Sequence, residues 1–198
     1  MIKAEDIEIV VASEKTVKYV DEILDTITRA AKVRGTGIAK RSPEYVKQKM
    51  LENKAVVALY KGEEFAGFSY IESWSNKQFV ANSGLIVANK FRGLGLANRI
   101  KRRIFELSRE RFPHAKIFSL TTGAAVMKIN NKLGFRPVTF DQLTDDEVSD
   151  APKLYNNLNG LYLYDGVFQG VFSRLGPLPT ISKDKQGMTA ATIWVGRG

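Results

Sequence analysis

Three strand-forming segments that follow one another with very little chain between them place the strongest constraint on the fold. Residues 55–60 (AVVALY), 65–74 (FAGFSYIESW) and 79–87 (FVANSGLIV) are rich in β-branched and aromatic residues, and 61–64 (KGEE) has the composition of a hairpin turn. Such short connections are typical of a β-meander, which we place at the centre of the sheet. Alternation along the middle strand puts the following side chains on one face: Phe68, Tyr70, Glu72 and Trp74.

Segments with helical periodicity lie on both sides of this meander. A short strand, 7–11, precedes apolar residues at helical spacing over 17–31, for which Ser13 or Thr16 is the expected N-cap. Ser42 and Pro43 predict a second helix that runs to about residue 53. The expected elements after the meander are a helix over 93–111, a strand over 116–120, a helix over 124–133 and a strand over 136–140. The order β-α-α-β-β-β-α-β-α-β predicts the α/β class, as an α+β protein with a mixed sheet.

The composition of the chain changes after Phe140. Residues 141–150 (DQLTDDEVSD) are acidic, and the segment up to residue 187 is rich in Asn, Gly and aromatic residues, with no clear period. Residues 188–195 (MTAATIWV) again have the pattern of a strand. We therefore predict a single domain, 1–198, with a core over 1–140, an insertion or subdomain over 141–187 and a final strand. The aromatic stretch 155–172 could cover a sheet edge or join subunits, so a homodimer is one expectation.

Composition also excludes several classes of protein. Among 198 residues there is no cysteine and one histidine, His114, which excludes a disulfide framework, a Cys-based zinc site and a multi-His metal centre. Lys and Arg exceed Asp and Glu by 30 to 21, but the densest basic segment, 99–111, contains two glutamates and fits the solvated face of a helix as well as an anion-binding surface. We expect neither a nucleic-acid partner nor a metal. Without a signal peptide or an apolar run of membrane length, we expect a soluble, cytoplasmic protein.

The segment Val87–Ala97 (VANKFRGLGLA) is the one most suggestive of chemistry. A strand ends, a turn carries Arg92-Gly93-Leu94-Gly95, and a long amphipathic helix begins. Glycines allow close approach of the backbone to a ligand, and the unpaired N–H groups and dipole of a helix N-terminus favour an anion. The segment lacks the Gly-Lys-Ser/Thr ending of a P-loop and the third glycine of a Rossmann fingerprint. It predicts a site for a pyrophosphate, with a ligand-free glycine turn as the alternative.

Arg92-Gly93-Leu94-Gly95-Leu96-Ala97 resembles the acyl-CoA signature of the GNAT N-acetyltransferase superfamily, and the downstream segment 130–136 (NNKLGFR) resembles its helix-to-strand segment. The resemblance covers roughly residues 5–140 and implies a GNAT fold with acetyl-CoA or another acyl-CoA as co-substrate. It implies that backbone amides over the segment hold the pyrophosphate: Arg92, Gly93, Leu94, Gly95, Leu96 and Ala97. It also implies that the backbone of Leu85, Ile86 and Val87 holds the pantetheine arm, and that a substrate amine attacks the thioester directly.

The sequence departs from the family pattern at both expected acid–base positions. Many members place an acidic tyrosine four residues before the glycine of Leu-Gly-Phe, where this chain has Asn130, which the resemblance makes a CoA contact and hydrogen-bond donor at the reaction. The early glutamate of the fourth strand is also missing, so the nearest candidate base is Glu72 on the adjacent strand. The alternatives are a solvent-facing Glu72 and deprotonation through water. His114 follows Pro113 in a turn, and we expect it at the surface.

The loop before the second helix bears on the acyl acceptor. The segment 40–45 (KRSPEY) resembles the acetyltransferase domain of N-acetylglutamate synthases, which implies glutamate as the acceptor and a place in arginine biosynthesis. Lys40 and Arg41 would bind a dicarboxylate through charge-assisted hydrogen bonds, with Asn82 and Ser83 as further candidate contacts. Arg41 on a loop without a ligand remains the alternative. Other open possibilities are a polyamine, an aminoglycoside or a protein N-terminus as acceptor, and a non-catalytic CoA-binding sensor.

Overall fold

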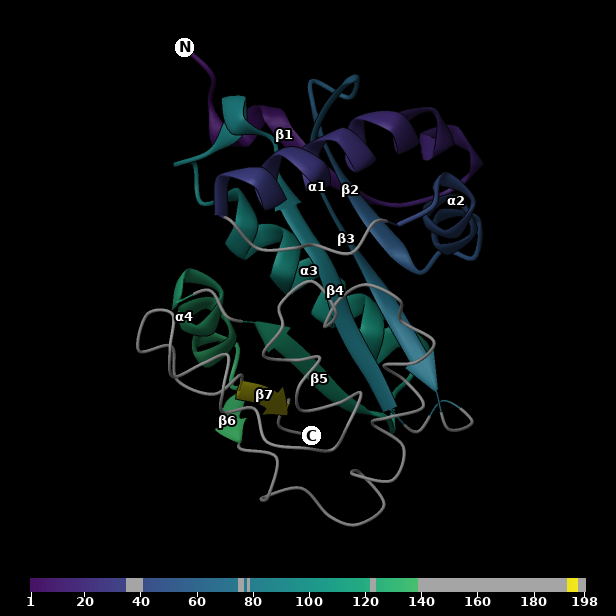
Figure 1. Ribbon diagram of the computed structural model, residues 1–198, viewed down its shortest axis with the longest axis vertical. Coiled ribbons are helices and arrows are strands. Elements are labelled where there is room, and N and C mark those ends of the chain that lie inside the picture. The colour runs from purple at the N-terminus through teal and green to yellow at the C-terminus, as the bar shows by residue number, and fades with distance from the viewer. Residues whose placement is uncertain (35–40, 75–76, 78, 122–123, 139–191, 196–198) are drawn as a thin grey trace. The chain divides into compact units, whose positions relative to one another are not determined.

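The computed structural model describes residues 1–34, 41–74, 77, 79–121, 124–138 and 192–195. The helices of Figure 1 are η1 (Ala4–Asp6), η2 (Glu14–Tyr19), α1 (Val20–Arg34), α2 (Pro43–Leu51), η3 (Asn89–Phe91), α3 (Leu96–Arg111) and α4 (Ala124–Lys132). The strands are β1 (Ile7–Val11), β2 (Ala55–Tyr60), β3 (Glu64–Trp74), β4 (Phe79–Val87), β5 (Lys116–Thr121), β6 (Arg136–Val138) and β7 (Thr192–Val195). None of the helices in these residues has the length and apolar character that crossing a bilayer requires.

The contacts of the chain divide it into two compact units that alternate along the sequence. The first contains Met1–Ala30, Arg41–Glu72 and Asn82–His114, and the second contains Ala31–Lys40, Ser73–Ala81 and Ala115–Gly198. The single domain predicted from the sequence stays a prediction, and so does the insertion over 141–187, which lies outside the described residues together with the aromatic stretch 155–172.

Neighbouring strands of the first unit follow the order β1-β2-β3-β4. β1 pairs antiparallel with β2, from Ile7 opposite Tyr60 to Val11 opposite Val56, and β2 pairs antiparallel with β3 across the turn at 61–63. A register shift between Ala58 and Leu59 interrupts the second pairing. The central meander predicted from the sequence is confirmed, because β2, β3 and β4 are successive neighbours in the sheet.

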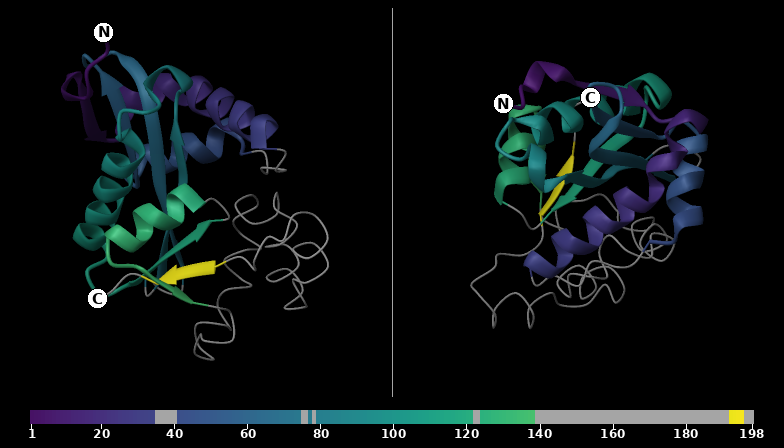
Figure 2. Two further views of the ribbon diagram at one scale, coloured as in Figure 1. Left: turned by 90° about the vertical axis from the view of Figure 1, so that its left-hand side faces the viewer. Right: turned by 90° about the horizontal axis from the view of Figure 1, so that it is seen from above.

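The two faces of these strands carry different helices, as the view from above in Figure 2 shows. A Cβ at Gly67 of β3 would lie 2.5 Å from the Ile100 side chain of α3, so that face of β3 is packed against α3. Glu72, an odd number of positions further on, contacts Lys49 of α2 on the opposite face. The predicted apolar stripe of α3 is buried throughout: Leu96, Ile100, Ile104 and Leu107. At about 1.5–3 kcal/mol for each buried side chain, this stripe anchors the helix that follows the glycine loop.

The sheet of the second unit includes the first three residues of β4. Phe79–Ala81 pair in parallel with 116–118 of β5, and β7 lies between β5 and β6, antiparallel to both. The predicted final strand is therefore present, with Thr192–Val195 as its described part. The mixed sheet is confirmed, since one parallel pair accompanies the antiparallel ones.

Two helix starts differ from the sequence-based expectation. The helix predicted from Gly93 begins at Leu96, because Gly93 and Gly95 have φ of 81° and 71° and left-handed residues cannot continue a helix. The first helix region opens as the 3-10 helix η2, in which Ser13 and Thr16 form a reciprocal cap, before α1 starts at Val20. The Ser42 cap is confirmed, since its hydroxyl accepts a hydrogen bond from the Tyr45 N–H at 3.1 Å.

Gly84 in β4 gives a test of how tightly β3 and β4 are packed. Its φ is 64°, and a Cβ there would lie 2.5 Å from the buried ring of Tyr70. We expect Gly84→Ala to destabilise the protein by about 2–4 kcal/mol, since it adds an overpacked contact to a strained backbone. Gly62→Ala is the matched control, because φ there is 75° and a Cβ would meet only the Glu8 side chain at 3.3 Å. Equal losses for the two variants in urea unfolding would contradict the clash.

Candidate active site

The loop between β4 and α3 presents a group of unpaired backbone donors. The N–H groups of Gly93, Leu94, Gly95, Leu96 and Ala97 have no hydrogen-bond partner among the described residues. The first helical bonds start at Asn98 and Arg99, whose N–H groups both donate to the Gly95 carbonyl. Arg92 differs from the sequence-based expectation, because its N–H already donates to the Asn89 carbonyl at 3.2 Å and closes η3. Its side chain is exposed and remains available to an anion.

The two glycines leave open space at this loop. A Cβ at Gly93 or at Gly95 would meet no other atom within 4 Å, whereas at Gly67 and Gly84 it would clash. The loop is therefore glycine-rich for its positive φ and its open face, not because the protein packs against it. The first turn of α3 contains no acidic residue, so nothing there opposes an anion. These features fit a pyrophosphate as the sequence predicted.

The strand before the loop changes its pairing along its length. β4 pairs with β5 only at Phe79–Ala81, and over the described residues the pairing goes no further. Its other edge still pairs with β3, where the Ala88 N–H donates to the Ala66 carbonyl at 2.9 Å. Leu85, Ile86 and Val87 therefore have one backbone edge without a strand partner in the described chain, which is the arrangement that the predicted pantetheine contacts require.

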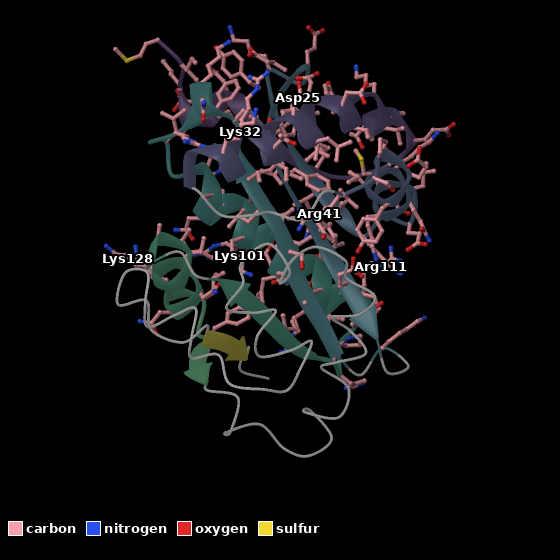
Figure 3. The ribbon with its side chains drawn as sticks, viewed as in Figure 1. Asp25, Lys32, Arg41, Lys101, Arg111 and Lys128 are labelled. Carbon is pink, nitrogen blue, oxygen red and sulfur yellow. The ribbon has the colours of Figure 1, made fainter. Side chains whose placement is uncertain are left out.

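A cluster of aromatic and charged side chains lies where α2 packs on β3, all within the first unit. The Tyr70 hydroxyl accepts a hydrogen bond from Arg41 Nε at 2.8 Å, and the Tyr70 and Tyr45 rings meet edge to face with centroids 6.0 Å apart. Arg41, labelled in Figure 3, directly precedes the N-cap of α2. Among the described residues its two terminal nitrogens have no hydrogen-bond partner. The planar guanidinium of Arg41 is held at Nε by Tyr70, and its terminal nitrogens are left to bind another acceptor. This arrangement suits a carboxylate.

Glu72 and Lys49 form a buried ion pair in the same cluster. Lys49 Nζ lies 2.8 Å from Glu72 Oε2, and the two side chains are 12% and 9% exposed. The other oxygen, Glu72 Oε1, is buried without a hydrogen-bond partner in the described chain, as is the Tyr45 hydroxyl. Glu72 is therefore not the solvent-facing carboxylate of the alternative interpretation.

Burial changes the protonation of both members of this pair. It raises the pKa of Glu72 to about 8, although the Arg41 guanidinium acts in the opposite direction. Burial, and next the Lys54 ammonium, lower the pKa of Lys49 to about 8, against the effect of Glu52. A carboxyl group that titrates near neutral pH is well matched to a general base, because a base works best when its pKa lies near the working pH.

The remaining predicted site residues do not all join this cluster. Asn82 lies on the face packed against α3, where its amide donates to the Ser108 hydroxyl at 2.8 Å. Ser83 is buried, and its carbonyl accepts a hydrogen bond from the Ser69 hydroxyl at 2.8 Å. Asn130, in the second unit, is fully buried and donates to the Ser119 hydroxyl at 3.0 Å, while its Oδ1 has no partner in the described chain. Lys40 lies outside the described residues, and His114 is exposed as expected.

Sequence reasoning did not single out Tyr45 and Lys49. A signal for them was present, because Arg41, Tyr45 and Lys49 are spaced four residues apart and so recur on one face of a helical segment. The apolar residues of α2 that pack into the core, Val46 and Met50, directly follow Tyr45 and Lys49 in the sequence. Only the packing of α2 on β3 shows that the polar positions are partly buried as well.

Comparison with known proteins supports the fold. Neither a scan against protein-family models nor a search of curated proteins finds a match. One similar solved structure is N-acetylglutamate synthase of Neisseria gonorrhoeae, in complex with coenzyme A and N-acetyl-glutamate. It matches with a TM-score of 0.59 and 14% identity, and the match covers 96% of this chain and 35% of the synthase chain. The protein Rv2747 of Mycobacterium tuberculosis, in complex with CoA, matches with a TM-score of 0.63 and 12% identity over 95% and 97% of the two chains.

An acetyltransferase of the GNAT family from Staphylococcus aureus matches with a TM-score of 0.57 and 16% identity over 70% of this chain and 89% of that one. This chain spans about a third of the length of the gonococcal synthase and nearly all of the mycobacterial protein. At identities this low the likeness shows the fold, and the fold is that of GNAT acetyltransferases. The fold implied by the glycine-loop resemblance is thus confirmed.

Proposed function

We propose that this protein is an acyl-CoA-dependent N-acyltransferase that transfers an acetyl group, or a related acyl group, to the amine of a small amino acid. The observation that carries the proposal is the row of unpaired N–H groups from Gly93 to Ala97 at the start of α3. Neutral solvent satisfies such donors less well than a pyrophosphate does, and the open face at both glycines leaves room for one. The CoA complexes of the gonococcal and mycobacterial proteins support the same ligand for this fold.

The chain's own residues would hold acyl-CoA as follows. The loop amides bind the pyrophosphate, the Arg92 side chain adds charge beside it, and the free edge of Leu85–Val87 binds the pantetheine arm. Bound acyl-CoA supplies the thioester, and Glu72 takes a proton from the acceptor's amine. Asn130 stays a proposed CoA contact and hydrogen-bond donor on the family pattern. Its buried Oδ1, which has no partner in the described chain, supports only the contact, as an acceptor of a hydrogen bond.

Glutamate is the acceptor that we propose. Arg41 supports it, because a guanidinium fixed by Tyr70 and open at its terminal nitrogens is suited to a carboxylate. The complex of the gonococcal synthase with N-acetyl-glutamate supports the same choice. A role in arginine biosynthesis and a cytoplasmic location would follow from this acceptor. Lys40 and Ser83 stay proposed acceptor contacts, as does Asn82, and a homodimer stays a proposed assembly.

The negative charge of Glu72 favours a second candidate acceptor, an amine without acidic groups. A carboxylate in the cluster attracts an ammonium group and repels a further carboxylate, so an amine that lacks acidic groups would also suit this site. The fold also matches a mosquito arylalkylamine N-acetyltransferase like 5b, with a TM-score of 0.55 and 16% identity over 71% of this chain. Arg41 would then interact only with Tyr70.

Replacing Arg41 distinguishes glutamate from an amine without acidic groups as the acceptor. If glutamate binds there, we expect Arg41→Ala to raise the KM for glutamate about 10–100-fold and to change the KM for acetyl-CoA little, since one charge-assisted pair is lost on the acceptor side only. Steady-state thiol release at varied glutamate measures this. Lys47→Ala, an exposed position on α2, is the control and is expected to leave both constants unchanged. An unchanged KM for glutamate in Arg41→Ala would refute the proposed carboxylate contact.

The function itself is tested by thiol release from acetyl-CoA across a panel of amino acids, amines and peptides, with calorimetric CoA binding measured beside it. Turnover with glutamate supports the proposal in full. Turnover with amines or peptides alone supports the acyltransferase and rejects glutamate. CoA binding without turnover, with acetyl-CoA and succinyl-CoA alike, would replace the enzyme with a CoA-binding sensor, and absence of binding would reject the proposal.

A further inference from the structure

Glu72 is held in a way that distinguishes it from the other described carboxylates in ion pairs. Its Oε2 accepts a hydrogen bond from Lys49, while its Oε1 is buried and has no donor among the residues that the structure describes. Leaving a buried oxygen without a donor costs about 1–3 kcal/mol, so such atoms persist where a bound group supplies the missing hydrogen. Oε1 is therefore an acceptor that lacks a donor in the described chain, on the same face of β3 as Tyr70 and its partner Arg41.

Lys49 is the described side chain that hydrogen-bonds Glu72 directly. Its ammonium is 2.8 Å from Oε2 and lies 5.2 Å from the centroid of the Tyr45 ring, so it is confined between α2 and β3. Both side chains are largely withdrawn from water, which disfavours the charged form of each. In such a pair the charged and the neutral forms lie close in free energy, and the two groups titrate together.

We propose that Lys49 and Glu72 work as one proton-sharing unit, in which Glu72 accepts a proton from the acceptor's amine at Oε1 and Lys49 is the positioning residue that sets when Glu72 is ionised. The inference rests on the proposed N-acyltransferase function and goes beyond it by assigning Lys49. It also explains how the chain manages without the early glutamate of the fourth strand.

The step balances as follows. The acceptor's ammonium group gives one proton to Glu72 Oε1 and becomes a neutral amine. The nitrogen lone pair attacks the thioester carbonyl carbon, a C–N bond forms, and the C–S bond breaks with its electron pair on sulfur. The second proton lost by the nitrogen ends on that sulfur, which gives an amide and the free thiol. Glu72 returns its proton to solvent before the next turnover.

Several charged groups face the pair and bear on its titration. Arg41 from the loop favours the ionised carboxylate, and Tyr45 and Tyr70 supply ring and hydroxyl groups. Glu52 and Lys54, paired with each other at 2.9 Å, act on Lys49 in opposite directions. With burial holding the pKa of Glu72 at about 8, kcat/KM is expected to rise with pH up to about 8, as the base becomes ionised.

Two substitutions of Lys49 are expected to move this pH profile in opposite directions. Lys49→Arg places a cation there that cannot lose its proton, so the pKa of Glu72 falls and the rising limb of kcat/KM shifts about one pH unit lower. Lys49→Met removes the cation, so the pKa of Glu72 rises and the limb shifts about one unit higher. A merely structural role for Lys49 would lower activity in both variants without opposite shifts.

The titration of Glu72 is also read directly, without turnover. The ¹³C carboxyl resonance of Glu72, assigned by its loss in Glu72→Gln, is followed with pH in the wild type and both Lys49 variants of the full chain. Lys90→Met is the matched control, because Lys90 makes the same 2.8 Å contact with Glu64 in an exposed pair. We expect Lys90→Met to change neither the titration of Glu72 nor the pH profile of kcat/KM.

The outcomes are distinguishable. The proposal is supported if both the Glu72 titration and the pH profile of kcat/KM move to lower pH in Lys49→Arg and to higher pH in Lys49→Met. A Glu72 resonance that titrates near the ordinary carboxyl value, or that ignores both Lys49 substitutions, overturns it. Turnover by the wild type with a pH profile that neither variant moves overturns the proton-sharing unit and leaves the acyltransferase standing. Failure of the wild type to release thiol with any acceptor overturns the proposed function and the catalytic role of Glu72 with it.

Discussion

Gly95→Val is expected to weaken acyl-CoA binding about 100-fold or more while the protein stays folded. Gly95 has a φ of 71° as the N-cap of α3, a conformation that a β-branched residue avoids. The substitution turns the neighbouring N–H groups out of position and fills the open face of the loop. Loss of two hydrogen bonds to a charged pyrophosphate, at about 1.5 kcal/mol each, corresponds to a factor of about 100 in Kd. Calorimetric titration with CoA measures it.

Gly62→Val is the control for backbone strain in this experiment. Gly62 has a φ of 75° in the turn between β2 and β3, and a Cβ there would meet only the flexible Glu8 side chain. It lies outside the β4–α3 loop, so we expect a small loss of stability and unchanged CoA affinity. Equal CoA affinity in Gly95→Val and the wild type would reject the assignment of the loop. Equal weakening by Gly62→Val would show that strain alone accounts for the effect.

Glu72→Gln is expected to lower kcat/KM about 100–1,000-fold near neutral pH. The substitution keeps the shape of the side chain and removes the carboxylate that takes the amine proton, and positioned general bases contribute about that much. The rising limb that Glu72 causes should disappear, so that any remaining pH dependence reports the acceptor's own amine. CoA affinity should be unchanged, because Glu72 faces α2 and is not among the proposed CoA contacts.

Glu64→Gln provides the matched carboxylate control on the same strand. Glu64 pairs with Lys90 at 2.8 Å in a half-exposed salt bridge, which contributes little to stability. We expect its kcat/KM and pH profile to equal those of the wild type. Thermal unfolding of both variants separates a lost base from a lost fold, since Glu72→Gln leaves Lys49 without its charged partner. A Glu72→Gln variant with wild-type kcat/KM and pH profile would exclude Glu72 as the base.

Local sequence signals predicted most of the elements correctly. The strands 55–60 and 79–87 match β2 and β4 to the residue, because their bounds are marked by turn residues and their composition is β-branched. The Ser42–Pro43 helix start is equally local. The start of α3 was placed at Gly93 instead of Leu96, because the sequence does not show which glycines of the loop adopt positive φ.

The glycine loop and the Lys49–Glu72 pair illustrate two kinds of site. The loop is contiguous, and its unpaired backbone N–H groups lie where a strand ends and a helix begins, so the sequence by itself determined where a candidate anion site lies. The composition also restricted the class of candidate bases, since one histidine and no cysteine leave mainly the carboxylates of Asp and Glu.

Tertiary structure decided which of these residues are buried and paired, and so at what pH they titrate. Glu72 and Lys49 are 23 positions apart, and only the packing of α2 on β3 brings them to 2.8 Å and removes them from water. The same packing places Asn82 on the α3 face, although it was grouped with the acceptor contacts from its place in the chain. The physical reason is that burial and pairing set the pKa of a side chain, and both depend on neighbours that are distant in sequence.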